Sequence, residues 1–266
     1  MQVNDALRNF IEETAREAGA LLRRKLYDRH DIEYKGEINI VTEVDRLSEK
    51  LVLDRIRHDF PDHGILTEES PEITGNSEFR WIIDPLDGTT NYAHGYPVFS
   101  VSIALEHEGI IVLGVVYNPM LDELFVATRG EGSYLNNRPL HVSRVDTLSR
   151  SLLATGFPYD LRTNKNNNIN YFKSMSVNAQ AIRRGGSAAF DLACVAAGRF
   201  DGFWELKLAP WDTAAAWLIV EEAGGVVTDL AGGAYNLYAP NILATNGLIH
   251  KEMIRIISRT DPFDKP

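Results

Sequence analysis

Apolar residues recur at steps of three and four along the start of the chain. Within residues 5–28 they are Leu7, Phe10, Ile11, Ala15, Ala18, Leu21, Leu22 and Leu26. This spacing matches the helical period and predicts one amphipathic helix. A polar stretch from Asp28 to Asn39 then breaks the pattern. A second helix is expected from Thr42 to just before Pro61, because Asp45 lies three residues after Thr42, as in a capping box.

From residue 64 the apolar pattern changes to short runs that are typical of strands. The runs cover residues 64–67, 80–83, 98–106, 110–117 and 123–127. Turn residues separate them, so we expect the first half to combine two helices with an antiparallel meander, which is an α+β layer.

Beyond Asp146 strands and helices alternate, as in an α/β half. Strands are predicted at residues 152–155, 180–183, 200–205, 226–228 and 242–245, and helices at 168–176, 187–198, 211–223 and 248–258. We therefore divide the chain into residues 1–146 and 147–266, which form one compact unit because no linker separates them. The asparagine-rich run Asn164–Asn168 is expected to be a solvated loop tip.

Composition restricts the function classes. With 266 residues, 44% hydrophobic and 24% charged, the chain is an ordinary globular protein. Its formal charge of -10 disfavours general affinity for nucleic acid or an anionic membrane and favours a cation as partner. The single cysteine, Cys194, lies in an apolar helical pattern, so we expect a buried thiol. No run approaches the ~20 apolar residues of a membrane span and no signal pattern opens the chain, so we expect a cytoplasmic protein.

The strongest chemical signal is the string Asp84-Pro-Leu-Asp-Gly-Thr-Thr-Asn91, which follows the apolar run Trp81–Ile83. Carboxylates such as Asp84 and Asp87 bind hard divalent cations. Gly88, Thr89 and Thr90 can open a helical turn whose N–H groups face an anion. The alternative is a proline turn with a helix cap, but the full string is much more specific than Asp-Pro alone.

Two further acids extend this set. Glu68 follows the apolar run Ile65-Leu-Thr67, and Asp212 lies at the start of a predicted helix. Singly, a surface acid and an N-cap are the commoner explanations. Together with Asp84 and Asp87 they complete a set of oxygen ligands. The seven histidines form no pair at metal-ligand spacing, so zinc is not expected.

The segments Glu68-Glu69, 84–91 and Trp211-Asp-Thr-Ala-Ala215 together resemble the metal-binding motifs of the inositol monophosphatase family, within the lithium-sensitive sugar-phosphatase superfamily. The likeness runs from about Ala6 to Ile257. It implies a layered αβαβα sandwich and magnesium-dependent hydrolysis of a small polyol phosphate, first of all inositol 1-phosphate. Fructose 1,6-bisphosphatase activity or dual specificity is the nearest alternative, and a non-enzymatic binding module is a further one.

The resemblance also implies roles for individual residues. Up to three magnesium ions would be bound by the metal ligands Glu68, Asp84, the Leu86 carbonyl, Asp87 and Asp212. Thr89, held by Asp45, would polarise the attacking water, with Glu68 and Asp87 in the same catalytic set. Lys35 would lie near the third ion.

Substrate contacts are implied as well. The amides of Gly88 and Thr89 would bind the phosphate. The rest of the substrate would contact Gly186, Ser187, Ala188, Glu205 and Asp212. Animal members carry a serine at the ring after the strand that corresponds to 152–155, whereas this chain continues with Gly156-Phe-Pro158. Family members are usually homodimers, and the apolar meander from Val98 to Val126 needs to be covered, so we expect a homodimer.

Overall fold

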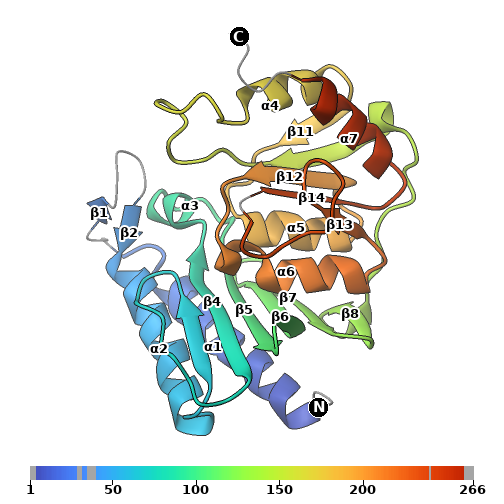
Figure 1. Ribbon diagram of the computed structural model, residues 1–266. Coiled ribbons are helices and arrows are strands. Elements are labelled where there is room, and N and C mark those ends of the chain that lie inside the picture. The colour runs from blue at the N-terminus through green and yellow to red at the C-terminus, as the bar shows by residue number, and fades with distance from the viewer. Residues whose placement is uncertain (1–3, 29–31, 35–39, 240, 261–266) are drawn as a thin grey trace.

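The computed structural model describes residues 4–28, 32–34, 40–239 and 241–260. Five layers of helices and sheets lie on one another in Figure 1. The outer helices are α1 (Asp5–Lys25) and α2 (Glu43–Asp59) on one side and α4 (Ile169–Ser176) and α7 (His250–Arg259) on the other. Between the two sheets lie α5 (Ala188–Ala196) and α6 (Pro210–Glu222). The expected αβαβα sandwich is confirmed.

The first sheet has seven strands in the order of the chain. They are β3 (Gly64–Thr67), β4 (Phe79–Asp87), β5 (Ser100–His107), β6 (Ile110–Asn118), β7 (Glu123–Thr128), β8 (Gly132–Leu135) and β9 (Arg138–Pro139). The meander is confirmed from β4 to β7, but β3 was wrongly included in it. β3 is parallel to β4, because residues 68–78 carry the chain back along the sheet before β4 begins. The short strands β8 and β9 were not predicted.

The second sheet has five strands in the order β11-β10-β12-β14-β13. They are β10 (Leu152–Thr155), β11 (Ala181–Arg183), β12 (Gly202–Leu206), β13 (Val226–Thr228) and β14 (Asn241–Thr245). β10 is parallel to β11 and β12, while β14 is antiparallel to β12 and β13. The α/β pattern is therefore confirmed. The 3₁₀ turn η1 (Leu148–Arg150) precedes β10, and the proposed division at residue 146 lies just before it.

The predicted start of α2 is confirmed. Thr42 is its N-cap, its side chain accepts the N–H of Val44 at 3.2 Å, and Asp45 accepts the N–H of Thr42 at 2.9 Å. The preceding stretch is not wholly a loop, because β1 (Ile32–Tyr34) pairs with β2 (Ile40–Thr42). Lys35 lies outside the described residues, so its place near a metal stays a prediction.

The meander is buried on both faces by helices of the same chain. Trp81, Ile83 and Ile103 pack with α1 and α2, whereas Ile82 and Ala104 face the cluster of α5 and α6. This alternation follows from the two-residue period of a strand. The apolar meander thus needs no second chain to cover it, and that reason for expecting a dimer was wrong.

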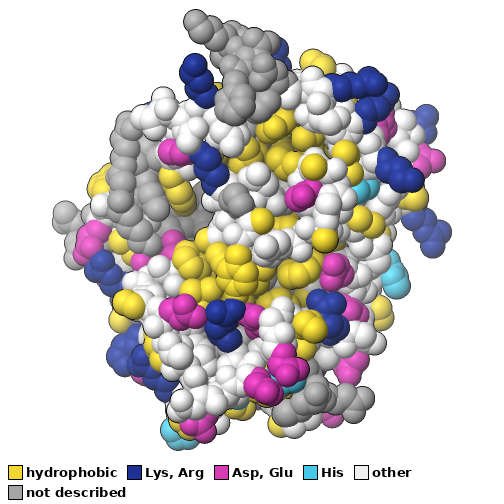
Figure 2. Space-filling view, in the orientation of Figure 1, with side chains coloured by type: hydrophobic (Ala, Val, Ile, Leu, Met, Phe, Trp, Pro, Cys, Tyr) yellow, Lys and Arg dark blue, Asp and Glu magenta, His cyan; other side chains and the backbone are white. Residues whose placement is uncertain are grey.

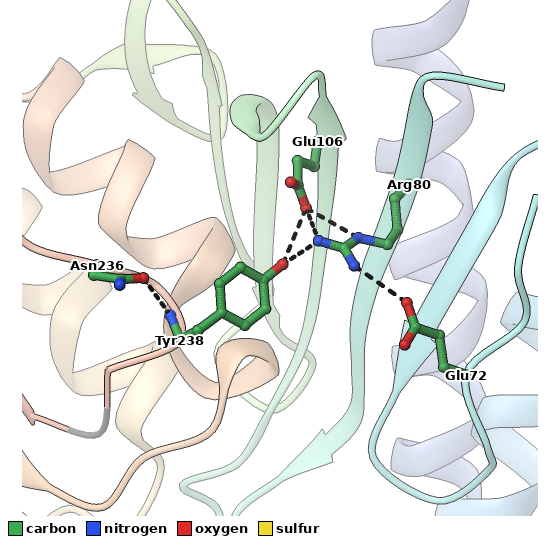
Figure 3. A network of polar contacts seen from close by, with 5 residues as sticks. All are labelled: Glu72, Arg80, Glu106, Asn236 and Tyr238. Carbon is green, nitrogen blue, oxygen red and sulfur yellow. Dashed lines mark hydrogen bonds and ion pairs between the residues drawn. The ribbon is translucent and has the colours of Figure 1, made fainter.

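A polar network joins the C-terminal half to the first sheet (Figure 3). Arg80 on β4 donates through Nη2 to Glu106 Oε2 on β5 at 2.7 Å, and through Nη1 to Glu72 at 3.1 Å. Tyr238, in the loop before β14, donates to the same Glu106 oxygen at 3.3 Å and lies under the Arg80 guanidinium. Because the Glu106 side chain is buried, its oxygens need these donors.

Figure 2 shows hydrophobic side chains gathered over the middle of one face, with acidic and basic side chains interspersed around them. Across the described ranges, no helix is long and apolar enough to cross a membrane.

Candidate active site

A bulge at the end of β4 turns two aspartates to the same side of the sheet. Asp84 pairs with Ser102 and Asp87 with Ser100, and the register shifts between them. Residues three apart on a regular strand face opposite sides, but Ser100 and Ser102 face the same side. The extra residue, in the segment Pro85-Leu86, therefore brings Asp84 and Asp87 together. Asp84 Oδ1 also accepts the Leu86 N–H at 3.0 Å.

Directly after β4 the chain turns sharply into α3 (Thr89–Ala93). Gly88 has φ 97°, and a Cβ there would lie 3.1 Å from the carbonyl oxygens of Gly186 and Val98. Glycine is thus required both by the left-handed backbone and by the close approach. The predicted helical turn at Gly88–Thr90 is confirmed.

Thr89 meets Asp45 of α2. Thr89 Oγ1 donates to Asp45 Oδ1 at 2.7 Å, and the other Asp45 oxygen accepts the Thr42 hydroxyl at 2.6 Å and the Thr42 N–H at 2.9 Å. Burial raises the pKa of Asp45, and these hydrogen bonds partly oppose that shift. One buried carboxylate therefore holds the Thr89 hydroxyl hydrogen and caps α2.

Asp87 reaches across to α5. Its carboxylate accepts hydrogen bonds from Ser187 Oγ at 2.6 Å and from the backbone N–H groups of Ala189 at 2.8 Å and Ala188 at 3.2 Å. Burial raises its pKa, while these donors lower it. Ser187 and Ala188, which the resemblance places near the sugar ring, thus donate to Asp87. Sequence reasoning missed this cap, because Asp87 and Ala189 are far apart along the chain.

The neighbouring loop is held against α3. Asn91 Nδ2 donates to the carbonyl oxygens of Gly185 at 2.8 Å and Val98 at 2.6 Å. Gly186, with φ 87°, lies directly beside the Asn91 side chain. The structure therefore brings the Gly186 backbone close to Gly88.

Asp212 and Glu68 complete the acidic set. Asp212 is the third residue of α6, not its N-cap, and its Oδ2 accepts the Ala209 N–H at 2.6 Å. Burial, and then Asp87, raise its pKa. Burial raises the pKa of Asp84 well above the ordinary value, and Glu68, Asp87 and Asp212 add to the shift. These acids are thus close enough to oppose one another's ionisation, and a cation would relieve that repulsion.

The chemistry of this donor set fits a hard divalent cation, since every ligand is an oxygen and most are anionic. As they stand, no three histidine, cysteine, aspartate or glutamate side chains within the described residues form a group that could hold a metal ion. Asp84, Asp87 and Asp212 are each directed towards backbone N–H groups. A carboxylate that accepts one or two N–H groups keeps further lone pairs, so these hydrogen bonds orient the acids and are compatible with a bound cation.

A cavity of about 340 Å³ opens beside these carboxylates. Asp87 and Asp212 line one side, and the segment 156–160 lines another. Glu205, at the end of β12, is buried in this cavity, and burial followed by Asp212 raises its pKa well above the ordinary value. Asp87, Asp212 and Glu205 therefore line one cavity.

A buried acid in the cavity lining, Asp191, was not predicted. Asp191 lies on α5 and is buried; burial, and then Asp87, raise its pKa to about 8, although it accepts the Gly185 N–H. A signal was present in the sequence, because an acid in an otherwise apolar helical pattern is rarely buried without a role.

The chain is similar to known proteins along most of its length. The model of the inositol monophosphatase family matches residues 3–261. An inositol-1-monophosphatase of Synechocystis sp. is 47% identical over 86% of this chain and 80% of its own length. Nus factor SuhB of Escherichia coli is 44% identical over 92% of this chain and 93% of its own length.

A solved structure shows the same fold. The extragenic suppressor protein SuhB from Bartonella henselae superposes with a TM-score of 0.92 at 43% identity, over 96% of this chain and 99% of that one. The resemblance inferred from the motifs is thereby confirmed over a slightly longer range. The chain belongs to the inositol monophosphatase family and is a phosphoric monoester hydrolase.

Proposed function

We propose that this protein hydrolyses inositol 1-phosphate with magnesium as its cofactor, bound by Glu68, Asp84, Asp87, Asp212 and the Leu86 carbonyl. The observation that carries the proposal is the Thr89–Asp45 hydrogen bond of 2.7 Å beside four acids, three of which have raised pKa values. The name inositol-1-monophosphatase of the Synechocystis relative supports the same substrate.

The chain's own groups account for water orientation. Asp45 accepts the Thr89 hydroxyl hydrogen, so the Thr89 oxygen keeps its lone pairs for a hydrogen of the attacking water. That contact would direct the water oxygen at the phosphorus. Bound magnesium would neutralise the phosphate charge and lower the pKa of water.

Substrate recognition would divide between two sides of the cavity. The Gly88 and Thr89 amides would face the phosphate end, while Gly186, Glu205 and Asp212 would face the ring. Glu205 supplies the carboxylate acceptor that a polyol hydroxyl needs, and it lines the cavity together with Asp212. This arrangement favours a hydroxyl-rich ring over an apolar leaving group.

The proposal is tested by phosphate release in magnesium from inositol 1-phosphate, fructose 1,6-bisphosphate, histidinol phosphate and adenosine bisphosphate. We expect the highest kcat/KM for inositol 1-phosphate. A higher value for fructose 1,6-bisphosphate would favour the alternative, and no release from any of them would refute the function.

The metal is tested separately. Magnesium prefers a near-octahedral shell at about 2.0–2.1 Å, whereas calcium accepts looser shells at about 2.3–2.6 Å. We expect calcium to compete with magnesium without supporting turnover. A calcium-only rate within a few-fold of the magnesium rate would contradict this part of the proposal.

A protein-binding role is the second candidate, because the E. coli relative, 44% identical over 92% of this chain, carries the name Nus factor SuhB. If it applies here, binding should not need catalysis. Pull-downs with wild type and Asp87→Asn should then recover the same defined partner, and loss of the partner in the variant would argue against a separate role.

A further inference from the structure

Gly156 and Glu205 are in direct contact at the ring side of the cavity. β10 and β12 run parallel with Thr155 opposite Trp204, so the next residues, Gly156 and Glu205, lie side by side. A Cβ on Gly156 would be only 2.1 Å from Glu205 Oε1 and 2.3 Å from its carboxyl carbon. The Glu205 carboxylate therefore occupies the space that any other residue at position 156 would fill.

Asn168 holds this pair of strand ends. Its Nδ2 donates to the Gly156 carbonyl oxygen at 2.6 Å and to Thr155 Oγ1 at 2.8 Å, and its Oδ1 accepts the Trp204 Nε1–H at 2.6 Å. Thr155 Oγ1 in turn donates to the Trp204 carbonyl oxygen at 2.6 Å. One asparagine side chain thus joins Trp204, the residue before Glu205, to Thr155 at the end of β10 and to Gly156 directly after it.

Asn168 was expected in a solvated loop tip, and that expectation was wrong. Only 2% of its surface is exposed, and its φ is 76°. Asparagine is among the few non-glycine residues that adopt this backbone readily. A buried amide with all these partners is costly to replace, because the groups left behind lose their hydrogen bonds.

We propose that Gly156 and Asn168 are positioning residues that fix the Glu205 carboxylate for hydroxyl recognition, and so select hydroxyl-bearing phosphates. This inference rests on the proposed function, in which Glu205 contacts the ring. It assigns a role to the segment Gly156-Phe-Pro158, where animal relatives use a serine. The hydroxyl acceptor on this side is then the carboxylate seated on Gly156.

Gly156→Ala is the decisive variant. The new methyl group would meet the carboxylate atoms of Glu205, which lie at the far end of a flexible side chain. The Glu205 carboxylate can therefore move away while the backbone keeps its position. The Gly156 backbone is outside the left-handed region, so alanine can adopt the same conformation. Gly64→Ala is the matched control, because a Cβ there makes only ordinary contacts at 3.5 Å and no positive φ is recorded there either.

The measurement is the ratio of kcat/KM for inositol 1-phosphate to that for phenyl phosphate, which has no ring hydroxyl. Losing a hydrogen bond to a charged group should lower this ratio by roughly 10- to 100-fold in Gly156→Ala. Gly64→Ala should keep the wild-type ratio. In a protein that already carries Glu205→Gln, Gly156→Ala should lower this ratio little further, since both changes act on the same contact. An unchanged ratio in Gly156→Ala, or additive effects in the double variant, would overturn the proposal.

Crystal structures of wild type and Gly156→Ala give a readout that does not depend on activity. We expect the Glu205 carboxylate to be displaced, and its presence at the wild-type position would overturn the proposal. A wild type inactive on both phosphates would refute the proposed function, while this structural comparison would still decide the positioning role. Asn168→Asp, which cannot donate to the Gly156 carbonyl, should lower the same ratio, whereas Asn166→Asp should not.

Discussion

At the scale of single residues, Asp87 combines two tasks that usually fall to different side chains. It belongs to the acidic set beside the cavity, and it also accepts the first N–H groups of α5. Acids at a helix N-terminus are stabilised by the free N–H groups there. The same hydrogen bonds fix the carboxylate in the site.

We expect Asp87→Asn to lower kcat by roughly a hundredfold or more, because the amide removes a charge that stabilises the reaction. The measurement is steady-state inositol 1-phosphate hydrolysis at saturating magnesium. Asp146→Asn, an exposed aspartate, is the control. Wild-type turnover in Asp87→Asn would exclude Asp87 from the catalytic set.

Asp191 should make stability depend on pH. Its pKa is raised to about 8, against about 3.9 in an unfolded chain, so between these values the folded state holds a proton that the unfolded state has lost. The free energy of unfolding must then fall as pH rises through this window. We expect Asp191→Asn to flatten that fall, as measured by Tm in chelator between about pH 5 and 8. An unchanged slope, with Asp146→Asn as control, would contradict the raised pKa.

At the scale of elements, the position of the water-orienting pair depends on two helices. Asp45 lies in the first turn of α2 and Thr89 opens α3, and a 2.7 Å hydrogen bond joins their side chains. Local patterns predicted both helix starts. That the two starts meet could not be read from either pattern.

Removing the hydroxyl should therefore affect the chemical step more than folding. We expect Thr89→Ala to lower kcat by roughly 10²- to 10⁴-fold, as for other groups that assist proton movement, and Thr89→Ser to restore most of it. Turnover of the wild type in oxygen-18 water should place one label in the released phosphate. Equal activity of the alanine and serine variants, or a trapped phosphoenzyme, would show that Thr89 does not orient the water.

The elements that were predicted correctly are those with a strong local period. α1, α2 and the strands β4 to β7 follow apolar patterns that a single segment carries. The failures have a common cause, which is pairing between segments. β8 and β9 are short strands with little apolar pattern, and the parallel direction of β3 depends on the course of residues 68–78.

At the scale of the whole molecule, the two sheets enclose α5 and α6, and the site lies where β4, α3, α5 and α6 meet (Figure 1). Glycine contributes to this packing, since a Cβ on Gly114 of β6 would lie 2.8 Å from the Ala215 carbonyl oxygen of α6. The close approach brings the α6 backbone, with Asp212 at its start, against the sheet that carries Asp84 and Asp87.

Assembly is the prediction that belongs to this scale. A homodimer is still expected from the family resemblance, although the meander needs no cover. The hydrophobic side chains gathered on the face in Figure 2 offer a surface that a partner chain would cover. Light scattering at micromolar concentration should give twice the chain mass of 29.8 kDa. A mass near that of one chain would contradict the dimer.

The sequence by itself determined the helices and strands with clear periods, the acids of the candidate site and the family, because local spacing and short motifs carry that information. Only the tertiary structure decided that Asp87 caps α5, that Asp191 is buried in the cavity, that Gly156 lies against the Glu205 carboxylate, and that Asn168 joins Gly156 to Trp204. Each of these depends on contacts between segments far apart in the chain. The physical reason is that burial and hydrogen-bond partners are set by the packing of layers, which no single segment specifies.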